Sequence, residues 1–126
     1  MTLPNIQGRP EQAFWNAIDQ LVAASQLVID RPKGSAHPRF PEIIYPLDYG
    51  YLDGTTSGDG QGIDVWLGSG PERQTTAIAC TIDLWKRDME IKILLSCTAA
   101  EIALIAAFLN QESQHAVVLK HHRPQI

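Results

Sequence analysis

The sequence has little of what marks secreted, membrane-spanning or disulfide-linked chains. It has only two cysteines, Cys80 and Cys97, and both have apolar neighbours, which is typical of buried free thiols rather than of a disulfide or a metal pair. No apolar run reaches about 18 residues, the length of a membrane-spanning helix. The first residues, 1–12, lack the basic-then-apolar order of a signal peptide. We therefore expect a protein of the reducing cytoplasm that does not bind a membrane.

The sequence also lacks a basic cluster. Lys and Arg number 10 against 14 Asp and Glu, and the formal net charge is −4. A protein that binds nucleic acid normally presents a basic patch, with stacking aromatic residues where the ligand is single-stranded. We therefore expect no nucleic-acid partner, and a single-strand-binding module is the weakest of the functional alternatives.

The length of 126 residues suits one domain made of short strands between two helices. Pro10 and an apolar face at helical spacing predict a helix over 10–25. The segment "TAAE", Thr98 to Glu101, matches a capping box and begins a second helix. Alternating or apolar runs predict strands at 26–30, 62–68, 75–85, 89–97 and 115–120. This order favours a small closed or partly closed barrel with flanking helices.

The segment "YPLDYGYLDGTTSGDGQGIDVWLG", residues 45–68, holds four aspartates, three tyrosines and six glycines. Several carboxylates select a hard cation, Mg²⁺ first. Asp59 and Asp64 are five residues apart, and the glycines between them allow a tight turn that can bring both onto one ion. Their spacing is not that of a calcium-binding EF-hand loop. The segment therefore predicts a metal site at Asp59 and Asp64.

Two further groups of charged residues could complete such a site. Asp83, Asp88 and Glu90 surround the turn at "KRD", and Lys92 shares a strand face with Glu90. This arrangement suits a metal-and-phosphate site, and it equally suits a surface ion pair. The segment "DRPKGSAHPR" brings the phosphate-binding residue types Lys and Arg close in sequence to the acidic segment. A solvated loop is the alternative there.

These motifs together resemble those of the family I soluble inorganic pyrophosphatases. "IDRPKGS" is similar to the family's E-I-P-K-G-S, and "YPLDYGYLDGTTSGDGQGID" to its signature Y-P-x-[ND]-Y-G-[FY]-x-x-x-T-x-x-x-D-G-D-P-x-D. "RDMEIKILL" resembles the later D-x-x-x-x-D-x-K segment with a shorter turn. The resemblance covers roughly residues 26–96. It implies an OB-like five-stranded barrel, with residues 1–25 as an added N-terminal helix and 97–126 as a C-terminal helix and tail.

The resemblance also implies an activity, namely hydrolysis of pyrophosphate to two phosphates by metal-activated water. The cofactor would be Mg²⁺, or Mn²⁺, and the protein a homo-oligomer. By position, the implied metal ligands are Asp59, Asp64, Asp88, Glu90 and Asp30. The implied catalytic residues are Asp64, Tyr49 and Lys92. The implied substrate-binding residues are Lys33, Arg39, Tyr45, Tyr49 and Lys92, with His37 as an alternative to Lys33.

The sequence departs from the family pattern at important positions. Gln61 stands where the family has the aspartate that acts as general base, and an amide has no useful basicity. The hairpin that brings a lysine and an arginine to the substrate is largely missing before Tyr45. Loss of a general base typically costs about 10² to 10⁴ in rate. Two hypotheses therefore stay open. The first is a hydrolase in which bound Mg²⁺ by itself activates the water, or in which Asp48 or Asp53 replaces the base. The second is a pseudoenzyme that binds metal and a phosphorylated ligand without efficient turnover.

Overall fold

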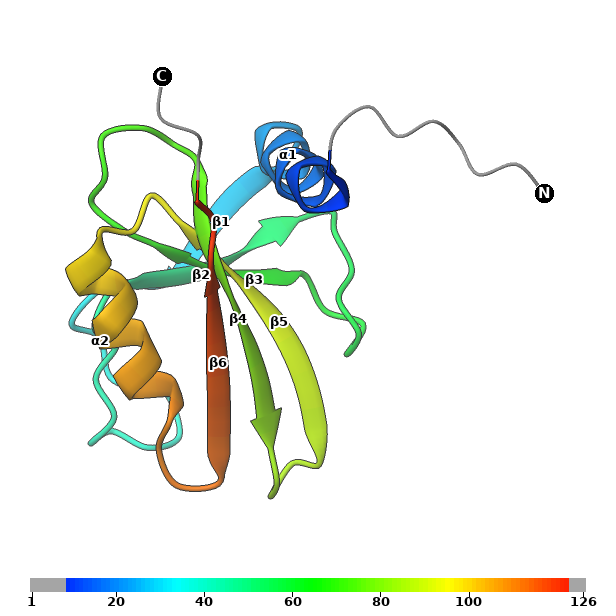
Figure 1. Ribbon diagram of the computed structural model, residues 1–126. Coiled ribbons are helices and arrows are strands. Elements are labelled where there is room, and N and C mark those ends of the chain that lie inside the picture. The colour runs from blue at the N-terminus through cyan, green and yellow to red at the C-terminus, as the bar shows by residue number, and fades with distance from the viewer. Residues whose placement is uncertain (1–8, 123–126) are drawn as a thin grey trace.

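The computed structural model describes residues 9–122, which form a six-stranded sheet and two helices (Figure 1). The elements are α1 (Pro10–Ala23), β1 (Gln26–Arg31), β2 (Asp48–Asp53), β3 (Ile63–Leu67), β4 (Thr75–Asp83), β5 (Asp88–Leu95), α2 (Ala99–Leu109) and β6 (Gln114–Lys120). The prediction of a mostly β fold with an N-terminal and a C-terminal helix is confirmed. No helix within residues 9–122 is long and apolar enough to cross a membrane.

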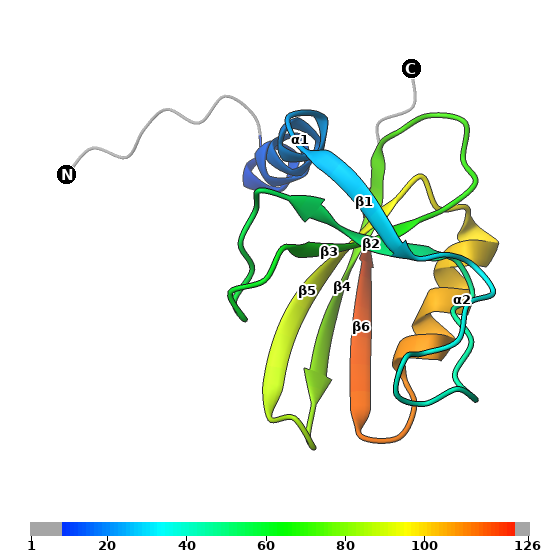
Figure 2. The same cartoon turned by 180° about the vertical axis from the view of Figure 1, so that it is seen from behind.

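The strands lie in the order β1-β2-β3-β5-β4-β6, and every neighbouring pair is antiparallel except β3 and β5. The sheet is open, and β6 is a sixth strand beside the five that an OB-like barrel implies. Strong twist turns β1, β2 and β3 across the long strands β4, β5 and β6 (Figures 1 and 2). The sheet therefore has the curvature of a partly closed barrel.

Strand β2 lies in a stretch that the sequence pattern predicted as loop, and this prediction was wrong. Glycine and aspartate are poor strand formers, so "DYGYLD" carries no strong strand signal. Gly50 pairs with Ile29 of β1 and with Val65 of β3. A Cβ atom at Gly50 would lie 1.8 Å from the backbone oxygen of Val28. The glycine therefore permits close approach of two strands, which a local pattern cannot reveal.

The sheet separates two apolar layers, because successive side chains along a strand point to opposite faces. Helix α2 covers one face, where Trp66 and Leu94 pack with Ile105. Helix α1 covers part of the other, where Val65 and Ile93 pack with Val22 and its neighbours. Cys97 lies buried in the first layer and Cys80 is half-buried, and both are free thiols as predicted.

The start of α2 is fixed by the predicted capping box. Thr98 Oγ1 accepts a hydrogen bond from the backbone N–H of Glu101 at 3.2 Å, and Glu101 Oε1 accepts from the N–H of Thr98 at 2.8 Å. The same carboxylate accepts from the backbone N–H of Ser69 at 3.0 Å. The helix is thus tied to the loop after β3, and this anchors the helix whose far end, Phe108 and Leu109, reaches the candidate site.

Helix α1 leaves the lower part of its sheet face uncovered (Figure 1). The side chains there come from β4, β5 and β6 and, apart from Cys80 and His115, are aliphatic. In register across the three strands they are Met89, Ile82 and His115, then Ile91, Cys80 and Val117. Met89 is 73% exposed, Val117 63% and Ile91 54%. Contiguous exposed apolar patches of this kind mark interaction surfaces in soluble proteins.

We expect copies of the chain to associate through this aliphatic face. In sedimentation equilibrium, the native protein should show a mass above the 13.9 kDa of one chain. Ile91→Lys should shift it toward that mass, because a charge cannot be buried unpaired between two apolar faces. Leu104→Lys is the matched control, because Leu104 is 52% exposed on α2 instead. A monomeric native protein at high concentration would contradict the expectation.

Candidate functional site

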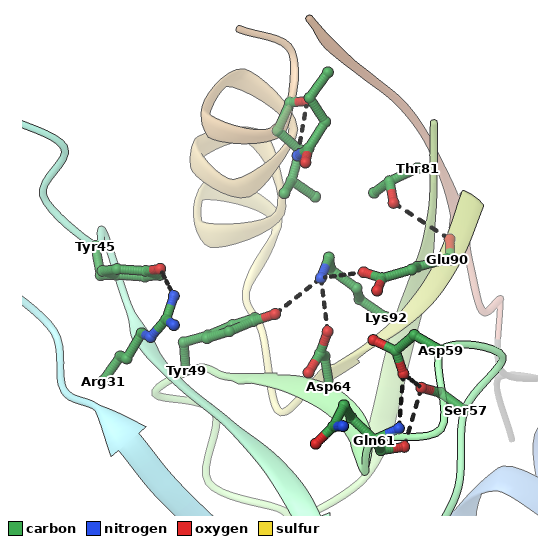
Figure 3. Close-up of polar contacts among 12 residues, drawn as sticks. Arg31, Tyr45, Tyr49, Ser57, Asp59, Gln61, Asp64, Thr81, Glu90 and Lys92 are labelled. Atoms are coloured by element: carbon green, nitrogen blue, oxygen red, sulfur yellow. Dashed lines mark hydrogen bonds and ion pairs between the residues drawn. The ribbon is translucent and has the colours of Figure 1, made fainter. Parts of the chain in front are cut away.

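The candidate site centres on a buried lysine that joins three strands. The neighbouring strands β2, β3 and β5 place Tyr49, Asp64 and Lys92 on the face that α2 covers. Lys92 Nζ donates hydrogen bonds to Tyr49 Oη at 2.8 Å, to Asp64 Oδ2 at 2.8 Å and to Glu90 Oε2 at 3.1 Å (Figure 3). Only 7% of Lys92 is exposed. The alternative of a solvated surface ion pair is therefore excluded for Lys92 and Glu90.

The protonation states in this network follow from burial and pairing. Burial disfavours the ammonium form of Lys92, but the oxygen groups of Tyr49 and Asp64 outweigh this and raise the pKa of Lys92 above its ordinary value. Burial also raises the pKa of Tyr49, against the opposing effect of Lys92. At neutral pH the site therefore holds an ammonium, whose three N–H groups all donate within this network, and a neutral phenol, whose hydroxyl can donate to a phosphate oxygen.

A further acidic residue, Asp59, lies beside Glu90 of this network. Burial raises the pKa of the Glu90 carboxyl, and the nearby Asp59 adds to the rise while Lys92 opposes it. Asp59 Oδ1 accepts from Ser57 Oγ at 2.5 Å and from the backbone N–H of Gln61 at 2.9 Å. These bonds, together with one from Glu90, lower the pKa of Asp59 to about 2. The loop before β3 thus holds an ionised carboxylate next to a half-buried one.

Whether these residues fit a metal depends on how many carboxylates can reach one ion. Within the described part of the chain, no three His, Cys, Asp or Glu side chains form a group that could hold an ion. The donors therefore do not fit the several-ion centre that the family resemblance implies. Mg²⁺, however, is commonly bound by one or two carboxylates together with water and substrate phosphates. Asp59 and Glu90 fit an ion of that kind, held together with its substrate.

Other predicted ligands lie apart from this pair. Asp30 is exposed at a bulge in β1 and makes no hydrogen bond or ion pair within residues 9–122. Asp88 precedes Glu90 by two residues, pairs in register with Asp83 and makes no polar side-chain contact there. Lys33 and Arg39 are exposed, and their hydrogen bonds to side chains among residues 9–122 come from the backbone N–H groups, which donate to Asp48 and to His37.

A cavity of about 780 Å³ opens beside the buried lysine. It lies between the α2-covered sheet face, the end of α2, the loop before β2 and the turn between β4 and β5. Lys92, Tyr49 and Tyr45 line it, as predicted substrate-binding residues, whereas Lys33 and Arg39 do not. The lining also includes Arg31, His37, Phe40, Ile44, Trp66, Trp85 and Phe108.

Sequence reasoning missed Arg31, the last residue of β1. Its guanidinium donates a hydrogen bond to the Tyr45 hydroxyl and lies 5.4 Å from the centre of that ring (Figure 3). Arg31 pairs in register with Tyr49, so it lies close to the phenol that contacts Lys92. The available signal was its place in "IDRPKGS", where a charged residue ends a strand directly before a glycine loop.

Comparison with known proteins supports the fold. No family model matches the chain, and no curated protein matches it in sequence. Among solved structures, an inorganic pyrophosphatase from Coxiella burnetii is similar over 75% of this chain and 82% of its own, with a TM-score of 0.55 and 15% identity. Structures of an inorganic phosphatase from Anaplasma phagocytophilum and of an inorganic pyrophosphatase from Helicobacter pylori each cover 75% of this chain and 81% of their own. Their TM-scores are 0.53 and 0.52, each at 14% identity. The chain therefore shares the fold of these proteins.

The hydrogen bond from Ser57 should be the main cause of the acidity of Asp59. In Ser57→Ala, the pKa of Asp59 should rise from about 2 toward the ordinary value near 3.9. A pKa that is lowered on folding stabilises the fold when the pH is above the pKa of the unfolded state, and this stability is lost as the pH falls from about 4 to about 2. The loss over this pH range should be smaller in the variant. Carbon-detected NMR titration measures the pKa directly. Thr56→Ala, at an exposed neighbour, should leave it unchanged, and an unchanged value in Ser57→Ala would refute the assignment.

Removal of the buried ammonium should destabilise the fold. Lys92→Met leaves Asp64 and Glu90 close together without a cation, which should cost about 3 kcal/mol in the free energy of unfolding. Protonation of Glu90 relieves this repulsion, so the deficit should be largest at neutral pH and should decrease as the pH falls below 5. Urea unfolding at pH 7 and pH 4.5 measures both effects. The exposed Lys120→Met is the control, and an equal loss in both variants would contradict the expectation.

Proposed function

We propose that this protein binds pyrophosphate or a related small phosphorylated compound at the Lys92 network and hydrolyses its phosphoanhydride bond with Mg²⁺ as cofactor. The observation that carries the proposal is the buried ammonium of Lys92, held by Tyr49, Asp64 and Glu90 at the wall of a large cavity. The fold shared with inorganic pyrophosphatases supports it.

The residues would divide the work by their chemistry. Tyr49 and Arg31 would donate hydrogen bonds to phosphate oxygens, Arg31 as a planar fork, and Lys92 would attract the phosphate as a point charge. Asp59 and Glu90 would hold Mg²⁺ together with the phosphates, and bound Mg²⁺ neutralises phosphate charge and acidifies water. Lys92 occupies one carboxylate oxygen of Asp64, so the other remains to accept a proton from the attacking water.

Gln61 supports a second candidate, binding of the same ligands without efficient turnover. The hydrogen bonds that Gln61 makes within the described residues come from its backbone, which donates to Asp59 and accepts from Ser57. Its side chain is exposed and its amide cannot take a proton from water. In this case the loop would keep the metal-binding carboxylate of Asp59 in place and lack the base.

A phosphate-release panel tests the first candidate. The substrates are pyrophosphate, short polyphosphate and nucleoside di- and triphosphates, each with Mg²⁺ and with Mn²⁺. Asp64→Asn should lower the rate by about 10²- to 10⁴-fold, because it removes the proton acceptor while keeping the shape of the side chain. Asp30→Asn should leave the rate unchanged, because Asp30 lies exposed at the β1 bulge.

Calorimetry with pyrophosphate separates the two candidates. Binding without phosphate release above the buffer blank would favour the second candidate, and a rate restored by Gln61→Asp would identify the missing base. Neither binding nor release with any metal in the panel would overturn both.

A further inference from the structure

The cavity beside Lys92 is far larger than pyrophosphate requires. Its volume of about 780 Å³ lies within the range of pockets that enclose drug-sized organic molecules. Pyrophosphate has only a few heavy atoms, and its oxygens can be satisfied at the polar end formed by Lys92, Tyr49 and Arg31. Most of the cavity therefore has no role in binding an inorganic substrate.

Away from that polar end, several large aromatic and apolar side chains line the cavity, together with charged ones such as Glu42, Lys86 and Glu112. Phe40 and Ile44 come from the loop before β2, Phe108 from α2, and Trp85 from the turn between β4 and β5. Trp85 is 75% exposed, Ile44 51% and Phe40 44%. Large side chains left exposed at the wall of a cavity offer burial to an organic ligand that an inorganic ion cannot use.

The rings on the loop side form a connected row. The His37 ring centre lies 5.3 Å from that of Phe40 and 6.2 Å from that of Tyr45, nearly parallel to the latter at 9°. Tyr45 in turn lies 5.6 Å from Tyr49, whose hydroxyl contacts Lys92. The row leads from the apolar part of the cavity to the polar end. Such rings are platforms on which a planar aromatic ligand stacks.

Positive charges lie near the His37 ring of this row. His37 Nδ1 accepts backbone N–H bonds from Arg39 and Phe40, which leaves Nε2 as the donor of a neutral ring. Burial and the positive charges of Arg31, Lys86 and Arg39 lower the pKa of His37, and Glu42 opposes them. In the lining as a whole, the positive charges of Arg31, Lys86 and Lys92 are balanced by the carboxylates of Glu42, Asp83 and Glu112. The carboxylate of Asp83, also in the lining, is already bonded to two backbone N–H groups of its own turn.

We propose that the ligand of this cavity is an organic diphosphate with a planar aromatic group, of the nucleoside diphosphate class. Its diphosphate would lie at Lys92, Tyr49 and Arg31, and its ring against Phe40 and Trp85. The inference rests on the proposed function for the phosphate end. In hydrolysis, water adds to the terminal phosphorus, the bond from that phosphorus to the bridging oxygen breaks, and the products are the monophosphate, inorganic phosphate and a proton.

Calorimetry on the full chain with Mg²⁺ tests the inference, with ADP, inorganic pyrophosphate and an alkyl diphosphate as probes. ADP should bind at least about tenfold more tightly than either of the others, because base stacking contributes to its binding alone. Trp85→Ala and Phe40→Ala should remove this advantage without changing the affinity for pyrophosphate. Leu84→Ala is the matched control: Leu84 is 64% exposed in the same turn but lies outside the cavity lining.

The possible results separate this inference from the proposed function. Equal affinity for ADP and pyrophosphate, or equally tight binding of the alkyl diphosphate, would overturn the inference even if pyrophosphate is hydrolysed. A Trp85→Ala variant whose affinity for pyrophosphate falls as much as its affinity for ADP would also overturn it. Binding of ADP that depends on Trp85, without phosphate release, would support the inference and refute the hydrolysis. Tryptophan fluorescence gives an independent readout, because Trp66 and Trp85 both line the cavity.

Discussion

The buried ammonium of Lys92 is the interaction on which the rest of the site depends. A charge taken out of water must be paired and fully hydrogen-bonded, or its burial destabilises the fold. Lys92 meets that requirement with Tyr49 from β2, Asp64 from β3 and its strand neighbour Glu90. The three strands must therefore lie side by side in this register. The apolar layer under α2 lies on one side of the network, and the acidic loop with Asp59 lies on the other.

What the sequence could predict is what local patterns encode. The cap at Thr98, the long strands after residue 75 and the shared face of Glu90 and Lys92 follow from spacings within a few residues. Strand β2 was not predicted, because the need for a glycine at position 50 arises from the backbone of Val28, which is distant in the sequence. The cavity could not be predicted either, because its walls come from segments that lie far apart in the sequence, and Arg31 has a role only once Tyr45 lies beside it.

Two departures from the pyrophosphatase pattern bring side chains to the same cavity. Where the family resemblance implies a hairpin with basic residues, this chain has a loop with a single strand bridge between Ala36 and Ile44, and Phe40 and Ile44 of this loop line the cavity. The turn between β4 and β5 likewise presents Trp85 to the same space. Both segments therefore add apolar and aromatic surface to the edge of the polar site, which agrees with the organic ligand that we propose.

The charge balance of the site sets a condition on any phosphorylated ligand. Glu90 interacts with the carboxylates of both Asp59 and Asp64, and Lys92 is already paired with Asp64 and Glu90. Arg31 is the nearby cation that is bonded to a neutral hydroxyl rather than to a carboxylate. A diphosphate anion alone would thus approach a region whose negative charges are not fully compensated. A divalent cation between Asp59, Glu90 and the phosphates would remove that repulsion, so cation and ligand should bind together, each raising the affinity for the other by the same factor.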